Sequence, residues 1–165
     1  MRTEGRRNHV RGKPSTVNRL RVAVSSAGVR APMAAARLEA TVRAVLRAER
    51  VRDALVSIAL VSKARIAALN AEHLKRRGAT DVIAFGFSRD RGGPVIGDIY
   101  ISPGVARENA LRHGVPVREE VARLVVHGVL HVLGYDHPAG SSREHSAMWR
   151  RQEVLLARFL RSRAA

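Results

Sequence analysis

The sequence predicts an α+β fold in which a small mixed four-stranded sheet packs with about five helices. Two observations support this prediction. Of the 165 residues, 45% are apolar, which is enough for one buried core of ordinary domain size. Short apolar segments alternate with helical patterns in the first part of the chain, and only helical patterns follow them.

Each strand is predicted from a short apolar run, β-branched or alternating with polar residues, that turn-forming residues bound. The four predicted strands are 20–25, 54–61, 82–87 and 95–102. Residues 89–94 form the predicted polar turn before the last strand.

Helices are predicted where apolar residues recur every three or four positions. We expect Pro32 to begin the first helix, Ser62 to cap the second, and Gly78 to end it. Pro103 suits a helix start, and Gly134 suits a position just past a helix end. The last three predicted helices are about 103–112, 117–133 and 141–161.

The net charge points to a polyanionic partner. The chain has 30 Lys+Arg against 14 Asp+Glu, a formal net charge of +16. RNA, DNA and anionic lipid are the candidates, although 27 of the basic residues are Arg and compositional bias is the alternative. Because only 4% of residues are aromatic, a stacking platform is disfavoured, and RNA would be bound mainly through its phosphates.

Residues 1–19 are predicted to be a disordered basic arm, and 20–165 a single domain. The arm carries six basic residues and one acid, with glycine and proline interspersed and no periodic apolar face. We expect it to add affinity for RNA without choosing sequence, since phosphate contacts carry no sequence information.

Several classes of protein are excluded by what the sequence lacks. It has no Cys, so a disulfide scaffold, a zinc ribbon, an iron–sulfur site and a thiol nucleophile are ruled out. No run approaches the roughly 18 apolar residues of a membrane span, and no hydrophobic signal region follows the first charges. We therefore expect a cytoplasmic protein without a membrane partner, whose metal sites use His and carboxylates.

Three histidines have the spacing of metal ligands. His127 and His131 are four residues apart, so on a helix they project from one face. Gly134 can end that helix and turn the chain, which would bring in His137. Three imidazoles leave one zinc position open for water or substrate, as in catalytic sites; nickel and copper also suit imidazole. The alternative is that backbone groups satisfy these histidines.

The spacing His-x3-His-x2-Gly-x2-His also occurs in metzincin proteases, which carry a general-base Glu directly after the first His. Here that position is Gly128, so a peptidase is disfavoured.

Residues 127–137, HGVLHVLGYDH, resemble the signature of the YbeY family, metal-dependent endoribonucleases linked to ribosomal RNA maturation. Two further blocks, 80–85 and 97–102, are similar to the family's strands, and Leu69-Asn70 and Met148 fall where the family places them. The resemblance covers roughly residues 20–160.

This resemblance implies a zincin-like fold with one Zn²⁺ bound by His127, His131 and His137 at the end of a core helix. It implies a single-strand-specific endoribonuclease acting on the 16S rRNA 3′ end and in ribosome quality control. RNA of the small ribosomal subunit would be the partner, with a ribosomal protein or an assembly GTPase as further candidates. One alternative is an rRNA- or ribosome-binding biogenesis factor with a structural metal; the other is a metallopeptidase.

The chain departs from the family after Asn70. Many members have Tyr-Arg where this chain has His73 and Leu74, and that Arg is implicated in RNA handling. Lys75, Arg76 or Arg77 could replace its charge. For catalysis we expect a zinc-bound water, with help from Arg76 and Asp136.

Several polar residues near these motifs have two interpretations. Asp136 could orient a ligand imidazole or cap the turn after Gly134. His145 could visit the cleft, but a surface position is favoured. Asp81 and Asp98 could shape the site, but structural hydrogen bonds at strand ends are favoured.

Overall fold

The computed structural model describes residues 19–87, 92–138 and 140–161. The predicted arm 1–19 therefore lies outside the described residues, except for Arg19, which belongs to the first strand. The first part of the predicted turn 89–94 also lies outside them.

The sheet is mixed and has four strands, as predicted. Its order is β1-β2-β4-β3, in which β1, β2 and β4 run parallel and β3 pairs antiparallel with β4. The strands are β1 Arg19–Ser26, β2 Asp53–Leu60, β3 Val82–Phe87 and β4 Val95–Ile101. Strand β3 is thus an edge strand.

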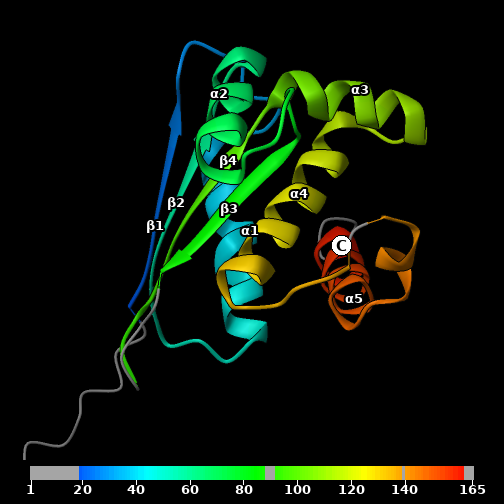
Figure 1. Ribbon diagram of the computed structural model, residues 1–165. Helices are drawn as coiled ribbons and strands as arrows, with labels where there is room; N and C mark the ends of the chain where they lie inside the picture. The colour runs from blue at the N-terminus through cyan, green and yellow to red at the C-terminus, as the bar shows by residue number, and fades with distance from the viewer. Residues whose placement is uncertain (1–18, 88–91, 139, 162–165) are drawn as a thin grey trace, which may run out of the picture.

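Five α-helices accompany the sheet in the described part of the chain, which confirms the predicted class. They are α1 Ala35–Ala48, α2 Lys63–Leu74, α3 Pro103–His113, α4 Val117–Val132 and α5 Ala147–Arg161. Figure 1 shows α2 on one side of the sheet and the other helices on the opposite side. None of the described helices combines the length and apolar character needed to cross a membrane.

Helix α4 is the central element of the larger core. Its apolar residues, among them Val125, Val129 and Leu130, are buried against β3, β4 and the neighbouring helices α1, α3 and α5. A smaller cluster around Ile66 and Ile83 seats α2 on the other face of the sheet. The histidines of α4 are therefore carried by the most enclosed helix of the fold.

Glycines let α4 approach the sheet closely. A Cβ on Gly128 would lie 2.8 Å from Ile99 Cγ2, and one on Gly97 would lie 2.4 Å from Val132 Cγ1. Contacts this short do not occur between real side chains, so any larger residue would displace α4 from β4. The position after the first histidine is therefore set by packing.

Helix starts agree with the sequence prediction at Ser62 and at Pro103, where α3 begins, and differ at Pro32. The Ser62 cap is confirmed, since its Oγ accepts the Arg65 backbone N–H at 3.1 Å. Helix α1 begins at Ala35 and not at Pro32, because Ala34 before it is still extended (φ −62°, ψ 144°).

The predicted stop of α2 at Gly78 is wrong. Helix α2 ends at Leu74, and Lys75 adopts the left-handed conformation (φ 55°) usually left to glycine. The backbone N–H groups of Lys75 and Arg76 both donate to the Asn70 carbonyl, which closes the helix end.

The predicted single helix 141–161 is also wrong. A 3₁₀ helix, η1 (Gly140–His145), precedes α5. Ser146 separates them and accepts the Trp149 backbone N–H on its Oγ at 3.1 Å, which is the contact of a new N-cap.

Candidate metal centre

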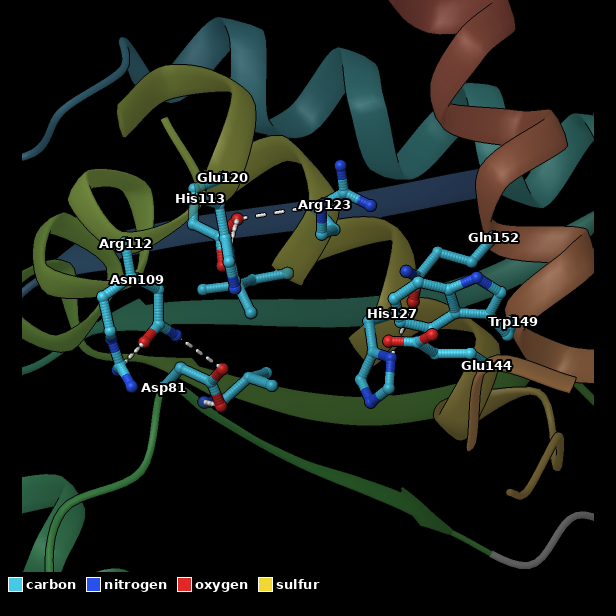
Figure 2. Close-up of a pocket in the computed structure, with 12 residues that line it drawn as sticks. Asp81, Asn109, Arg112, His113, Glu120, Arg123, His127, Glu144, Trp149 and Gln152 are labelled. Carbon is cyan, nitrogen blue, oxygen red and sulfur yellow. Dashed lines mark hydrogen bonds and ion pairs between the residues drawn. The ribbon is translucent and has the colours of Figure 1, made fainter. Parts of the chain in front are cut away.

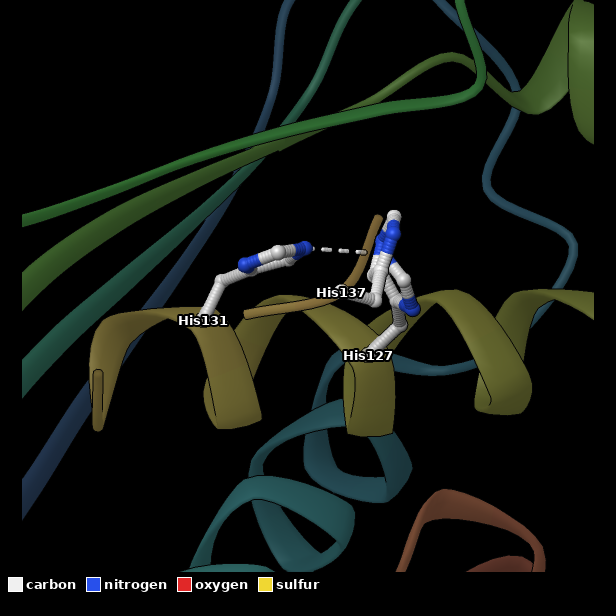
Figure 3. Close-up of side chains that lie close together, drawn as sticks. All are labelled: His127, His131 and His137. Atoms are coloured by element: carbon white, nitrogen blue, oxygen red, sulfur yellow. Dashed lines mark hydrogen bonds between the residues drawn. The ribbon is translucent and has the colours of Figure 1, made fainter. Parts of the chain in front are cut away.

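Three imidazole rings converge on one side of α4. His127 and His131 are one turn apart on the helix, with ring centroids separated by 4.7 Å. His137 closes the triangle, at 5.2 Å from His127 and 5.1 Å from His131. One ring nitrogen of each lies within 4.8 Å of the other two, so the cluster could hold a metal ion (Figure 3).

The chain reaches His137 through a tight reversal at the end of α4. Gly134 has φ +94°, its N–H donates to His131 O, and the Tyr135 N–H donates to Leu130 O. This pair of bonds is the Schellman arrangement, which requires a left-handed residue at the position of Gly134. The predicted role of Gly134 is therefore confirmed.

The segment that carries His137 is held by contacts on both sides. Asp136 Oδ1 accepts the His137 backbone N–H at 2.8 Å. Tyr135 donates its hydroxyl to Glu49 Oε2 at 2.7 Å, and Arg151 Nε donates to Glu49 Oε1 at 2.6 Å. The bond to Glu49 raises the pKa of Tyr135. Glu49, at the end of α1, therefore ties the ligand loop to α5.

Each histidine has an oxygen against its Nδ1 atom. His127 Nδ1 lies 2.7 Å from Gln152 Oε1, His131 Nδ1 lies 3.0 Å from Tyr135 O, and His137 Nδ1 lies 3.0 Å from Pro138 O. Carbonyl oxygens only accept, so each Nδ1 carries the proton and donates it. The lone pair of each neutral ring is then on Nε2, which is the form that binds a metal.

The Nε2 atoms of His127 and His131 are 3.1 Å apart. With both protons on Nδ1, two lone pairs face each other across this distance, an arrangement that a bound cation would stabilise. The Gln152 amide supports this assignment, since its Nε2 donates to Glu153 Oε1 at 3.2 Å and only its oxygen is left for His127.

Electrostatics keep the two helix ligands neutral. Burial lowers the pKa of His127 to about 4, against the opposing effect of the hydrogen bond that its Nδ1 donates to Gln152. Burial and then the neighbouring His137 lower the pKa of His131. Neutral imidazoles are what metal binding needs, and an all-nitrogen donor set of three fits zinc as well as nickel or copper.

A cavity of about 480 Å³ adjoins the cluster and has His127 in its wall. Figure 2 shows Trp149, Glu144 and Gln152 on the side of His127, with Asp81, Asn109 and Glu120 across the cavity. The remaining lining residues come from β3, α3 and α4: Val82, Arg112, His113, Arg123 and Leu124. The cavity and the histidine cluster therefore share His127.

A chain of polar contacts joins the cavity wall to the first ligand. Arg123 pairs with Glu153 Oε1, Glu153 accepts from Gln152, and Gln152 accepts from His127. Gln152 is only 1% exposed, so this contact is shielded from water. Its role is to fix the orientation of the His127 ring.

The other predicted site residues lie in different surroundings. Asp136 is exposed and caps its own turn. Arg76 is exposed in the loop after α2, and in the described part of the chain it neither lines the cavity nor hydrogen-bonds to the three histidines. His145 is exposed at the end of η1, in line with the surface interpretation.

The two aspartates make structural hydrogen bonds. Asp98 Oδ1 accepts from Ser57 Oγ at 2.5 Å across the strands β2 and β4. Asp81 accepts from Val82 N at 2.8 Å and from Asn109 Nδ2 at 3.1 Å, which fixes the start of β3 against α3. Asp81 also lines the cavity, so it is part of the site's surroundings.

Sequence reasoning missed Gln152 and Glu49. Gln152 could have been found, because it occupies the buried stripe of α5 with Met148, Leu155 and Leu156, and a polar residue there needs a partner. Glu49 gave no local signal, since its partners Tyr135 and Arg151 are far away in the sequence.

Comparisons with known proteins agree on one family. The family model described as "Endoribonuclease YbeY" matches residues 24–160. A relative named "Endoribonuclease YbeY" from Anaeromyxobacter sp. is 41% identical over 138 residues, which cover 83% of this chain and 70% of that protein. Another of that name, from Geobacillus kaustophilus, is 38% identical over 114 residues, 63% of this chain and 72% of that protein.

A solved structure has a similar fold. The solution structure of a Thermotoga maritima protein is 25% identical to this chain, with a TM-score of 0.56, and the match covers 86% of this chain and 90% of that one.

Proposed function

Because this chain belongs to the YbeY family of endoribonucleases, we propose that it is a metal-dependent endoribonuclease that cleaves single-stranded RNA in ribosomal RNA maturation. The observation that carries the metal dependence is the set of three histidines that each bring one ring nitrogen within 4.8 Å of the other two, with an oxygen against every Nδ1. We propose Zn²⁺ as the ion. The substrate proposed is the 3′ end of 16S rRNA, with a further role in ribosome quality control.

The residues that would hold the ion are His127, His131 and His137. Zinc bound there would supply Lewis-acid polarisation of a phosphoryl oxygen and would lower the pKa of a bound water. Gln152 holds the His127 ring, and the carbonyls of Tyr135 and Pro138 hold the other two. These contacts fix the orientation of the three rings that would hold the ion.

Two further residues are proposed to assist the metal site. Asp136 acts through the backbone of His137, which makes it a positioning residue. The family's Arg corresponds to Leu74 in this chain. Arg76, two residues later, would supply positive charge near the phosphate. The net charge of +16 supports an RNA partner, here the small ribosomal subunit in the cytoplasm, with a ribosomal protein or an assembly GTPase as protein partner.

A peptidase remains disfavoured for a packing reason. A general-base Glu after His127 would have to replace Gly128, whose Cβ position is already 2.8 Å from Ile99. The Glu49 contacts tie the ligand loop to α1 and α5 without a metal ion, which weighs against the alternative of a biogenesis factor with a structural metal.

Cleavage of a single-stranded RNA that carries the small-subunit rRNA 3′ end tests the proposal. We expect the zinc-loaded protein to cleave it, and His131→Ala to retain its fold, lose the metal and lose cleavage. His145→Ala, which changes an exposed histidine outside the cluster, is the matched control and should cleave like the wild type. Equal cleavage by wild type and His131→Ala, or RNA binding without cleavage, would favour the structural-metal alternative.

A further inference from the structure

The cavity beside the metal cluster differs in charge from the rest of the protein. Three carboxylates line it, from Asp81, Glu120 and Glu144, against the two arginines Arg112 and Arg123. In a chain with a net charge of +16, this is a local excess of hydrogen-bond acceptors. A phosphate group would be repelled by these carboxylates, whereas a group with N–H donors would be attracted.

Glu120 has an acceptor that the protein leaves unused. Its side chain is only 3% exposed, and its Oε2 is buried and has no hydrogen-bond partner among the residues that the structure describes. Arg123 Nε and His113 Nδ1 each lie 3.7 Å from that oxygen, which is close enough for attraction but beyond hydrogen-bond distance. A buried carboxylate without a full set of hydrogen bonds is costly, so it marks a place where a donor fits.

The other side of the cavity offers an aromatic surface. Trp149, the single tryptophan of the chain, lines the cavity from α5, next to His127 (Figure 2). Nucleobases stack on such side chains with little regard to sequence, while carboxylates accept from their amino groups. The cavity volume of about 480 Å³ is in the range of sites for small ligands.

We propose that this cavity binds the base of a nucleotide that flanks the cleaved phosphodiester, and that Glu120 selects bases with an exocyclic amino group over uracil. Uracil presents its N–H donor between two carbonyl oxygens, which a carboxylate repels. Because His127 belongs both to the cavity wall and to the metal cluster, a base in the cavity brings its own phosphate towards the cluster. The inference rests on the proposed function for the RNA substrate.

Binding can be measured without cleavage, because Trp149 fluorescence reports on the cavity. The metal-loaded full chain is titrated with nucleoside monophosphates in matched pairs: CMP against UMP, and GMP against IMP, which lacks the amino group. We expect each nucleotide to quench the fluorescence of Trp149, and the amino-bearing member of each pair to bind about tenfold more tightly. This factor corresponds to one hydrogen bond to a charged group. Equal binding within both pairs would overturn the inference.

Glu120→Gln keeps the shape and removes the charge. Its amide can donate as well as accept, so the preference should fall to about twofold or less. Glu119→Gln removes the same charge one residue away, outside the cavity lining, and should keep the preference. Loss of preference in both variants would show a general charge effect and would contradict the assignment to Glu120.

Cleavage of RNAs that differ only in the base beside the cut separates this inference from the proposed function. Cleavage without base preference would overturn the base-binding cavity and leave the endoribonuclease intact. Selective quenching without any cleavage would support the cavity and overturn the proposed activity.

Discussion

The histidine cluster proposed to bind the metal combines side chains from two different kinds of structure. His127 and His131 come from α4, which is buried on the sheet. This helix cannot shift without disturbing two close contacts, Gly128 with Ile99 and Val132 with Gly97. His137 comes from the loop that follows, whose position depends on a reversal at Gly134 and on the contact between Tyr135 and Glu49. Helix packing therefore fixes two ligands, and a few hydrogen bonds fix the third.

This difference indicates which supporting contacts can be removed to lower metal affinity without removing a histidine. Removing a ligand destroys the cluster wherever that ligand comes from. Loosening a support should cost more on the helix side, where the contact is buried, than on the loop side, where it is partly exposed.

The largest effect is expected from His127→Ala. It removes a ligand and leaves two imidazoles, so metal affinity should fall by more than the roughly 100-fold that loss of a supporting contact can cost. Metal content after dialysis and competition with a chromophoric chelator measure this, with His145→Ala as the control. Retention of one metal ion per chain by His127→Ala would contradict the assigned ligand set.

Acid should destabilise the metal-free protein through the half-buried histidines of α4. The pKa of His127 is about 4 in the folded chain and 6.5 when unfolded, so below pH 6.5 the unfolded chain binds a proton that the folded chain does not. Stability is therefore full above pH 6.5 and is lost as the pH falls to about 4, by about 3 kcal/mol at about 1.36 kcal/mol per pKa unit.

Urea unfolding of chelator-treated protein between pH 7.5 and pH 4 measures that loss. In His127→Asn, which has no titrating ring at this position, the dependence on pH in this window should be smaller. An unchanged dependence would assign the acid sensitivity to other groups.

A smaller effect is expected from Gln152→Leu, which removes the support of His127. Loss of an oxygen that orients a ligand imidazole typically lowers metal affinity by about 10- to 100-fold. The same chelator competition measures it, and Val154→Ala, an exposed position on the same helix, is the control. If Gln152→Leu binds metal like the wild type, the ring of His127 is held by packing alone.

The smallest effect is expected from Tyr135→Phe, on the loop side. It removes one hydrogen bond to Glu49, worth about 1 kcal/mol, so metal affinity should fall by less than about tenfold. Tyr100→Phe, on the α2 side of the sheet, is the control. A loss greater than that of Gln152→Leu would reverse the comparison and make the loop the more sensitive support.

The same contrast separates what the sequence predicts from what it does not. Spacing within one helix places His127 and His131 together, and a glycine stop predicts the return of His137, because these features depend on local backbone geometry. The Tyr135–Glu49 bond joins positions 86 residues apart, so no local pattern announces it.

The helix boundaries that failed were also decided by local chemistry that competes with the apolar pattern. Lys75 took the left-handed position expected of Gly78, and the Ser146 cap began a new helix inside a continuous helical pattern. The cavity was beyond prediction for another reason. Its residues come from β3 and the residue before it, α3, α4, η1 and α5, and only the packing of these elements brings Glu120 and Trp149 to one space.

The ligand set has a consequence for oxidative conditions. Sites that bind zinc through thiolates release it when the sulfur is oxidised, because a sulfenic acid or a disulfide no longer coordinates. This chain has no cysteine, and Met148, the sulfur-bearing residue of α5, is 1% exposed in the core. Peroxide therefore has no sulfur ligand to attack at the proposed site, and retention of a metal bound there should follow the acidity of the medium and not its redox state.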